Sequence, residues 1–480
     1  MKLYSFSLLF SFVCCQQLFS QSYTPVIELA VCPIKTDARL IVKYGYLVVP
    51  ENRKKVNGRK VKIPFFFARQ PNHDAKKNVF LYTTGGPGYS AIDNTDSVGY
   101  ESGLLKYGGL ILFDQRGTKL AKPCLDCTEI PLAVKRSYEE GLNKDSLVLI
   151  AIKDCRKRFV SQGIDLSAFN TMESAEDIND LRLALHLDSL NLAGVSYSGG
   201  LMLNVLRNHP EAVRTLMLNS PLPSYARYDE DGLININEAL NQVFTNYEDD
   251  SLMSKTSINL RERFQRYFTD ITGKIFQLNY LKRNARDSTR IYYTKGELLD
   301  IIVNRLNGDQ VKTIPAVIDD LVAGKHRSYV TELIDGGFSE DHSVSLGMRY
   351  SVYCTEQIAY SDPVLEKLQN TVLPWLAGCS FNDVSRTVCD CWKVRPEPEI
   401  VRKQVYSKVP ALIVGGDIDP SCRPFYNRLI KRYMPNAQLM LVHNGGHGPG
   451  YVVDGINYAT LFFENPNKKI VSQSKNLIME

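Results

Sequence analysis

One serine of this chain has the sequence context of a catalytic nucleophile. Ser196 lies in the stretch GVSYS (194–198), between an almost wholly apolar run and a segment with helical periodicity. A serine on a sharp turn from strand to helix exposes its hydroxyl at the end of a sheet, where it can attack a substrate. Ser196 directly follows the predicted strand and is therefore the predicted nucleophile. Ser198 would fall within the first helical turn and is the alternative.

A serine nucleophile needs a base that takes its proton and a carboxylate that orients this base. Asp417 and Asp419 follow one later apolar run, and His447 follows the next run, in a glycine-rich loop. We predict Asp419 as the acid, because a proline constrains the turn after it, and His447 as the base. Asp417 is the alternative acid. His443, at the end of its strand, is predicted to be structural.

Acyl transfer also needs hydrogen-bond donors for the negative charge that develops on the carbonyl oxygen. The loop TTGGPG (83–88) follows another apolar run, and its glycines allow backbone N–H groups to point at one position. Pro87 has no N–H group, so Gly86 is the predicted donor from this loop. Tyr197, the residue after the nucleophile, is the second predicted donor of this oxyanion hole.

These loops follow short segments that are predicted to be buried strands. Almost wholly apolar runs occur at 78–84, 109–114, 190–195, 215–220, 411–416 and 438–443. Such strands are typical of a sheet covered on both faces, and the helical patterns between them predict an α/β fold with a mostly parallel, doubly wound sheet. The runs 40–49 and 61–68 predict an opening antiparallel pair. Asp114 and Arg116 are predicted to form a buried ion pair that shapes a loop near the site.

The strand pattern breaks between about 224 and 395, where the segments are amphipathic and helical. We predict that this region is a helical cap inserted between two strands of one sheet. The predicted division is a signal peptide at 1–22, a first core part at 23–223, the cap at 224–395 and a second core part at 396–480.

Composition and the N-terminus predict an exported protein. The chain has 480 residues and a formal net charge of +5, and it has no run of five like charges, so nucleic-acid binding has no support. Lys2 precedes an apolar stretch at 3–15 that has the length of a signal-peptide core and is too short to span a membrane. We expect a secreted or periplasmic protein without stable membrane insertion. A lipoprotein anchor at Cys15 is disfavoured, because Cys14 precedes it.

Of the eleven cysteines, two lie within the predicted signal peptide and nine follow it. In an exported protein these are expected to form disulfides rather than a thiol active site, and their odd number leaves at least one of them free. We predict one bridge between Cys127 and Cys155 and one between Cys354 and a member of the pair Cys389 and Cys391. No histidine pair accompanies the close cysteine pairs, so we expect no metal site and no cofactor.

Several motifs together resemble a known family. They are GGPG (85–88), DQRGT (114–118), GVSY (194–197), GDIDP (416–420) and GGH (445–447). This set is similar to that of the α/β-hydrolase serine exopeptidases of the prolyl aminopeptidase and tripeptidyl aminopeptidase group. The resemblance implies an α/β-hydrolase fold with an eight-stranded sheet and a large helical cap between strands 6 and 7. It also implies the roles predicted above for Ser196, Asp419 and His447, and for the oxyanion donors Gly86 and Tyr197.

The chain departs from the family pattern at two positions. Thr84 stands where prolyl aminopeptidases usually have histidine, and Ser198 replaces the glycine after the family's Ser-Tyr pair. Neither position belongs to the predicted triad. The second departure leaves the packing of the turn around Ser196 as a question for the structure.

By this resemblance we expect a secreted aminopeptidase that acts on peptides with a free N-terminus and releases proline-type residues or di- and tripeptides. Such an enzyme needs a carboxylate for the substrate ammonium, because an unpaired buried charge is costly. Glu356 in the cap is the candidate. The alternatives are a carboxylesterase that uses the same triad and, less favoured, an inactive binding homologue. Epoxide hydrolases and dehalogenases are disfavoured, because they have aspartate where this chain has Ser196.

Overall fold

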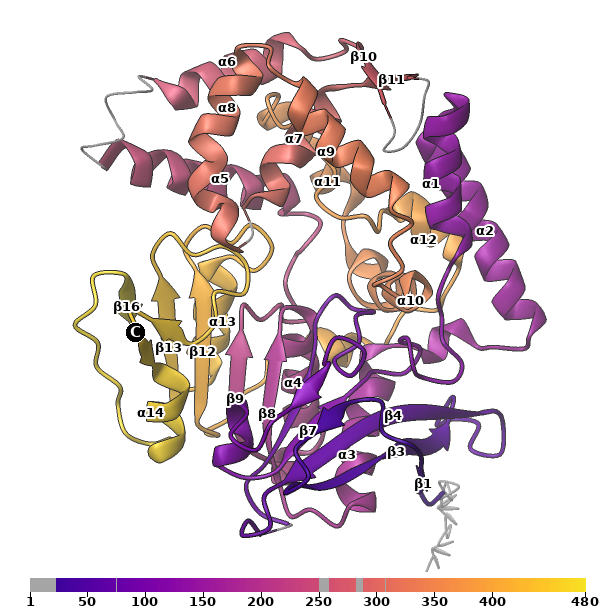
Figure 1. Cartoon of the computed structure of the whole chain (residues 1–480), viewed down its shortest axis with the longest axis vertical. Coiled ribbons are helices and arrows are strands. Elements are labelled where there is room, and N and C mark those ends of the chain that lie inside the picture. Colours follow the sequence, from indigo (N-terminus) through magenta and orange to yellow (C-terminus); the bar gives the residue numbers. More distant parts are fainter. Residues whose placement is uncertain (1–22, 75, 250–258, 282–287, 307) are drawn as a thin grey trace, which may run out of the picture.

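The structure of the chain, a computed structural model, describes residues 23–74, 76–249, 259–281, 288–306 and 308–480 (Figure 1). The predicted signal peptide, with Cys15, lies outside the described residues. None of the described helices is both long enough and apolar enough to cross a membrane.

A single ten-stranded sheet forms the centre of the fold. From edge to edge its strands are β1 (Val26–Leu29), β3 (Ile41–Pro50), β4 (Lys60–Arg69), β7 (Leu110–Phe113), β5 (Val79–Thr83), β8 (Leu190–Val195), β9 (Val213–Asn219), β12 (Ala411–Gly416), β13 (Ala437–Val442) and β16 (Leu477–Met479). The six strands from β7 to β13 are parallel to their neighbours, and the outer strands pair antiparallel. The mostly parallel sheet is confirmed. It has two strands more than the predicted eight, because β1 and β16 each add an antiparallel edge strand.

Helices cover both faces of this sheet, which explains why its central strands are apolar on both sides. On one face, α3 (Thr171–Ala184), α4 (Tyr197–Asn208) and α13 (Pro424–Tyr433) contribute to the largest apolar core. On the other face, α14 (Tyr458–Glu464) packs Phe462 into a smaller core with Leu412 and Met440. The short strands β2 (Lys35–Thr36) and β6 (Ser97–Val98) pair with each other, as do β14 (Val452–Val453) and β15 (Ile456–Asn457).

The cap is inserted between β9 and β12, and in Figure 1 it lies above the carboxyl ends of the parallel strands. Its helices are α5 (Gly232–Asp249), α6 (Leu260–Asp270), α7 (Lys295–Asn304), α8 (Ile314–Val322), α9 (Arg327–Phe338), α10 (Leu346–Glu356), α11 (Pro363–Val372) and α12 (Arg386–Trp392). An apolar core of its own, around Phe264, Phe268 and Ile302, holds much of the cap together. The cap also contains an antiparallel hairpin of β10 (Phe276–Tyr280) and β11 (Thr289–Tyr293), which the helical prediction missed.

A helical hairpin from the first core part extends upward beside the cap (Figure 1). It consists of α1 (Glu129–Glu140) and α2 (Lys144–Ser161), and Arg156 of α2 donates to the carbonyl of Trp392 in α12 at 2.6 Å. Both predicted disulfides are present: Cys127–Cys155 joins the start of this hairpin to α2, and Cys354–Cys389 joins α10 to α12. The second bridge selects Cys389 from the two candidates of the sequence. The broader expectation of disulfides is wrong for the remaining five cysteines, which are not bridged within the described part of the chain: Cys32, Cys124, Cys379, Cys391 and Cys422.

Candidate active site

Ser196 forms the turn between β8 and α4. Its backbone has φ 56° and ψ −126°, a conformation that is rare for a residue with a side chain. Hydrogen bonds hold the turn on both sides: the Ser196 amide donates to the carbonyl of Asn219, and its carbonyl accepts from the amide of Leu222. This strained strand-to-helix turn is the geometry expected for a nucleophile elbow.

Ser198 is fully buried and faces the sheet. Its hydroxyl accepts a hydrogen bond from the Val195 amide at 2.8 Å, and its Oγ, as donor, lies 2.9 Å from the carbonyl oxygens of both Thr83 and Val195. The side chain thus ties the end of β8 to the end of β5. Helix α4 comes closest to the segment after β9 at the two residues that follow Ser198. A Cβ on Gly199 would lie 2.6 Å from Pro221, and a Cβ on Gly200 would lie 2.2 Å from Leu222.

Asp419 and His447 form a hydrogen-bonded pair at the ends of β12 and β13. Nδ1 of His447 lies 3.0 and 2.9 Å from the two carboxylate oxygens of Asp419. One of these oxygens also accepts from the amides of Ser421 and Cys422. The neighbouring Asp417 lies instead 2.9 Å from Nδ1 of His443. Because Nδ1 of His447 is engaged by Asp419, its Nε2 is the nitrogen available to act on another group.

Burial and mutual charge control how this pair titrates. Burial alone would lower the pKa of His447, but the adjacent Asp419 carboxylate raises it above its ordinary value. Burial opposes ionisation of Asp419, yet the interaction with His447 and the backbone donors lower the pKa of this carboxyl. The carboxylate is therefore ionised at neutral pH. It accepts a hydrogen bond from Nδ1 of His447 and thereby orients the imidazole.

The glycine loop before the cap lies directly against the elbow. A Cβ on Gly85 would lie 2.6 Å from the Val195 carbonyl oxygen and 2.9 Å from Cβ of Ser196. Gly86 has φ 112°, in the region that favours glycine. Within the described residues, the N–H groups of Gly86 and Tyr197 have no hydrogen-bond acceptor. Both are thus available to bind an oxygen next to Ser196.

Ser196 and His447 line one cavity of about 450 Å³ together with Gly86. The cap closes this cavity with Tyr228, Tyr353 and the ion pair of Arg349 with Asp383. The further lining residues are Thr84, Gly85, Tyr89, Val195, Val344 and Ser421. The predicted nucleophile, the predicted base and one predicted oxyanion donor therefore line a single space between core and cap. Asp419 does not line this cavity and is buried behind His447, to which it bonds.

Glu356 is not among the residues that line this cavity. The residue is 2% exposed, and its carboxyl accepts hydrogen bonds from the hydroxyl of Thr171 and from the side-chain amide of Gln357. The same Thr171 hydroxyl lies 2.9 Å from the hydroxyl of Tyr197, so Glu356 lies behind the Tyr197 side chain. Burial raises the pKa of the Glu356 carboxyl, which weakens it as a partner for an ammonium group.

Asp114 and Arg116 do not pair with each other, so the predicted ion pair is wrong. Asp114 accepts from the hydroxyl of Ser90 and two backbone amides, while Arg116 binds Asp177 of α3 through two hydrogen bonds of 2.7 Å. Arg116 also donates to two backbone carbonyls and is fully buried. The two side chains extend to different elements, and this arrangement fixes the loop after β7 against the helical layer.

Sequence reasoning missed three residues around the cavity. Arg349 and Asp383 lie in the cap without a recognisable motif, and only the folding of the cap brings them to the site. Cys422 is fully buried next to the hydroxyl of Ser196, and burial raises the pKa of its thiol well above the ordinary value. A thiol with a raised pKa is a poor nucleophile, so Cys422 has a packing role in this arrangement.

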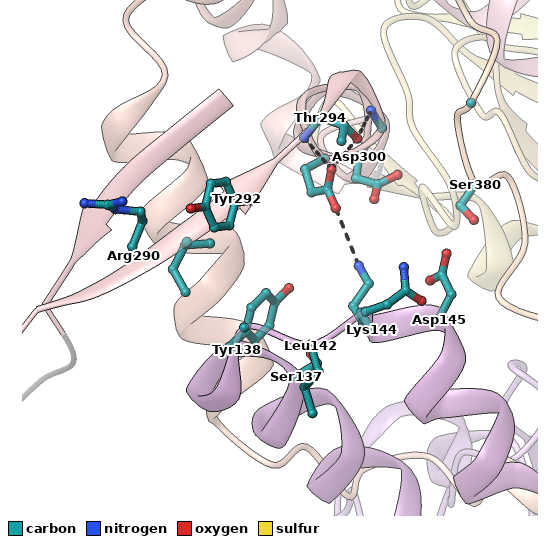
Figure 2. Close-up of a pocket in the computed structure, with 16 residues that line it drawn as sticks. Ser137, Tyr138, Leu142, Lys144, Asp145, Arg290, Tyr292, Thr294, Asp300 and Ser380 are labelled. Atoms are coloured by element: carbon teal, nitrogen blue, oxygen red, sulfur yellow. Dashed lines mark hydrogen bonds and ion pairs between the residues drawn. The ribbon is translucent and has the colours of Figure 1, made fainter. Parts of the chain in front are cut away.

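A second cavity, of about 380 Å³, lies between the α1–α2 hairpin and the cap (Figure 2). Lys144, Tyr138 and Asp300 face it, and Lys144 lies 3.8 Å from Glu297. Burial raises the pKa of Asp300 to about 6. This cavity shares no lining residue with the cavity of Ser196, and it contains no activated nucleophile among its described residues. The candidate active site is therefore the cavity of Ser196.

The fold and this site define a hydrolase of the α/β class with a nucleophile elbow. A family model described as "alpha/beta hydrolase fold" matches residues 109–451, most of the chain. The chain belongs to the α/β-hydrolase fold family.

Individual relatives are more distant. Tripeptidyl aminopeptidases of Streptomyces lividans and Streptomyces coelicolor are each 26% identical to the chain over 188 residues, which are 37% of this chain and 35% of each relative. The match thus spans about a third of the length of these curated relatives. The similarity to the tripeptidyl aminopeptidase group is confirmed at this level.

Solved structures with a similar arrangement include both peptidases and esterases. A proline iminopeptidase of Mycobacterium smegmatis has 10% identity and a TM-score of 0.39, with 88% of this chain and 97% of that chain covered. A thermophilic esterase from Thermogutta terrifontis has 12% identity and a TM-score of 0.30, with 84% and 91% covered.

Proposed function

We propose that the protein is a serine hydrolase that uses Ser196, His447 and Asp419. The observation that carries this proposal is the pairing of buried Asp419 with His447 in the cavity that also contains the strained Ser196 turn. His447 takes the proton of the Ser196 hydroxyl as this oxygen attacks the substrate carbonyl. The amides of Gly86 and Tyr197 bind the resulting oxyanion, and His447 returns the proton to the leaving group. Water then releases the acyl group by the reverse sequence.

We further propose that the substrates are peptides with a free N-terminus, from which the enzyme releases short N-terminal units. The similarity to tripeptidyl aminopeptidases supports this choice. The cavity also offers a carboxylate other than the triad acid, since the Asp383 side chain is 50% exposed. In this proposal Asp383 replaces Glu356 as the group that meets the substrate ammonium. The predicted signal peptide supports export as part of the same proposal.

A carboxylesterase that uses the same residues is the second candidate. One observation favours it: Asp383 is already paired with Arg349, with Nε at 2.7 and 2.9 Å from the two carboxylate oxygens. A carboxylate that is compensated in this way attracts an ammonium less strongly than a free one. The aromatic side chains of Tyr228 and Tyr353 in the same cavity suit an uncharged acyl group.

The two candidates are separated by matched substrates. The purified mature protein is assayed on aminoacyl, prolyl, dipeptidyl and tripeptidyl anilides, on the N-acetylated form of each, and on short-chain esters. The aminopeptidase proposal predicts that free-amine anilides are turned over faster than acetylated ones. Faster turnover of acetylated anilides and esters supports the esterase instead. Activity that persists in Ser196→Ala contradicts the serine mechanism altogether.

A further inference from the structure

The cap reaches the proposed oxyanion loop through the start of helix α10. The amide of Ser345, which precedes α10, donates to the carbonyl of Gly88 at 2.9 Å. A Cβ on Gly88 would lie only 2.8 Å from the Ser345 carbonyl oxygen. The two backbones are therefore in direct contact, and a side chain at position 88 would separate them.

Two side chains on successive turns of α10 reach the carbonyl of Gly86. Arg349 donates to this oxygen through Nη1, and the hydroxyl of Tyr353 lies 3.4 Å from it. Glycine has no Cβ to restrict its backbone, and Gly86 has φ 112°. Fixing its carbonyl limits rotation about its backbone bonds, and thereby the direction of its N–H group.

Arg349 is itself held in one orientation. Its Nε bonds both oxygens of Asp383, and its Nη2 lies 3.3 Å from the side-chain oxygen of Asn382. The guanidinium also lies 4.9 Å from the ring centroid of Tyr353. The side chain is 17% exposed, so solvent competes little with these contacts. A planar guanidinium that is bonded on several sides is a rigid support for the carbonyl it contacts.

We propose that Arg349 is a positioning residue for the oxyanion hole. It holds the Gly86 carbonyl so that the Gly86 N–H group points at the oxygen of the reacting carbonyl, and Asp383 fixes Arg349 for this purpose. The cap thereby completes the catalytic geometry in addition to enclosing the substrate. This inference rests on the proposed serine mechanism and on Gly86 as a donor. It predicts that Arg349 stabilises the transition state and does not affect ground-state binding of a substrate that has no ammonium group for Asp383.

The kinetic test compares Arg349→Met with the wild type on one free-amine substrate and on its acetylated form. Misplacing an oxyanion donor is expected to lower kcat about 10- to 100-fold on both, with KM for the acetylated form changed by less than about threefold. Arg349→Lys, which keeps the charge and one donor, is expected to recover part of kcat. Arg386→Met is the matched control, because Arg386 is a cap arginine that bonds Ser361 and Glu366 instead of the loop. Its kinetics are expected to match the wild type.

A binding test isolates the hole itself. Phenylboronic acid forms a tetrahedral adduct with a serine nucleophile and places an oxygen in the oxyanion hole. Its Kd is expected to rise in Arg349→Met by about the factor that kcat loses. Unchanged kcat and boronate affinity in Arg349→Met would overturn the proposal, as would a loss confined to KM. If Arg349→Met does not fold, Arg349→Lys carries the same test with a smaller expected loss.

Labelling of Ser196 by a fluorophosphonate, located by mass spectrometry, separates this inference from the proposed function. An unlabelled Ser196 in the wild type contradicts the serine mechanism. Equal labelling rates in the wild type and Arg349→Met contradict only the role of Arg349. Slower labelling in Arg349→Met, with Arg386→Met unchanged, supports it.

Discussion

The carboxylate of Asp419 bonds Nδ1 of His447 with both oxygens, at 2.9 and 3.0 Å. Two residues earlier in the same loop, Asp417 bonds His443. The two aspartates are close in sequence and of the same type, yet only one of them bonds the histidine that lines the same cavity as Ser196. This difference provides a test: the same substitution is made at each aspartate, and each of the two variants is the control for the other.

Asp419→Asn is expected to lower kcat about 10³- to 10⁴-fold, because an amide no longer holds the imidazole in the required tautomer or stabilises its positive form. Asp417→Asn makes the same chemical change two residues away and is expected to leave kcat within about threefold of the wild type. The measurement is kcat/KM on the best anilide or ester substrate. Equal losses in the two variants contradict the assignment of Asp419.

The pH dependence follows from the titration of His447. The base must be neutral to accept the proton of Ser196, and the Asp419 carboxylate raises the pKa of His447 above its ordinary value of about 6.5. We therefore expect kcat/KM to rise with pH, with the midpoint of its acid limb above 6.5. In Asp419→Asn the residual activity is expected to have its midpoint at lower pH. The histidine pKa from NMR titration checks both shifts.

Ser198 is expected to act on stability rather than as a nucleophile. Ser198→Ala removes the partner of the Val195 amide and the donor to the Thr83 carbonyl, and is expected to cost about 1–3 kcal/mol of unfolding free energy. The Ser196 hydroxyl remains, so fluorophosphonate labelling is expected to persist. Urea unfolding measures the stability change, with Ser161→Ala at an exposed helix end as a control near zero. Lost labelling in Ser198→Ala would reopen the choice of nucleophile.

The buried pair of Arg116 and Asp177 is expected to be a major contribution to stability. Arg116→Met removes two of the three arginine hydrogen bonds to the buried Asp177 carboxylate and leaves only the one from Arg53, and we expect a loss of about 3–5 kcal/mol in unfolding free energy. The control is Arg395→Met. Arg395 forms an ion pair with Asp165, but its side chain is 69% exposed, so this pair is expected to contribute less than about 1 kcal/mol to the unfolding free energy. Similar losses in the two variants contradict this reasoning.

The same pair predicts how stability depends on acid. Burial opposes the ionised form of Asp177, but Arg116 and Arg53 lower the pKa of this carboxyl below its ordinary value. Its contribution is therefore present above the unfolded pKa of about 3.9 and is lost as the pH falls through the folded value. Wild-type stability is expected to fall below about pH 4. Asp177→Asn is expected to be less stable at pH 7 and to lose less on acidification, as measured by thermal unfolding across this range.

The choice of ammonium partner is tested with Asp383→Asn and Glu356→Gln. Asp383→Asn is expected to raise KM about tenfold for a free-amine peptide and to leave KM for its acetylated form unchanged, because only the first has a charge to bind. It is also expected to lower kcat on both substrates, since Arg349 loses its anchor. Glu356→Gln is expected to leave both KM values unchanged. A selective rise in KM for Glu356→Gln would restore the sequence-based candidate.

The amino-acid sequence by itself was sufficient to predict the local features of this protein. Apolar strands, glycine loops and the turn at Ser196 are encoded in short segments, so the mostly parallel sheet and the positions of Ser196, Asp419 and His447 at strand ends could be read from neighbouring residues. The same local signals located the inserted cap. They did not fix the disulfide connectivity, since Cys389 and Cys391 remained alternative partners of Cys354 until the structure selected Cys389.

Only the tertiary structure decided which of these groups meet across the fold. It paired Asp419 rather than Asp417 with His447, directed Arg116 to Asp177 rather than Asp114, and buried Glu356 behind Tyr197. It also brought Arg349 and Asp383 to the cavity, although no local pattern marks them. Each outcome depends on packing between segments far apart in the chain, and an ion pair or hydrogen bond forms with whichever group that packing places within reach.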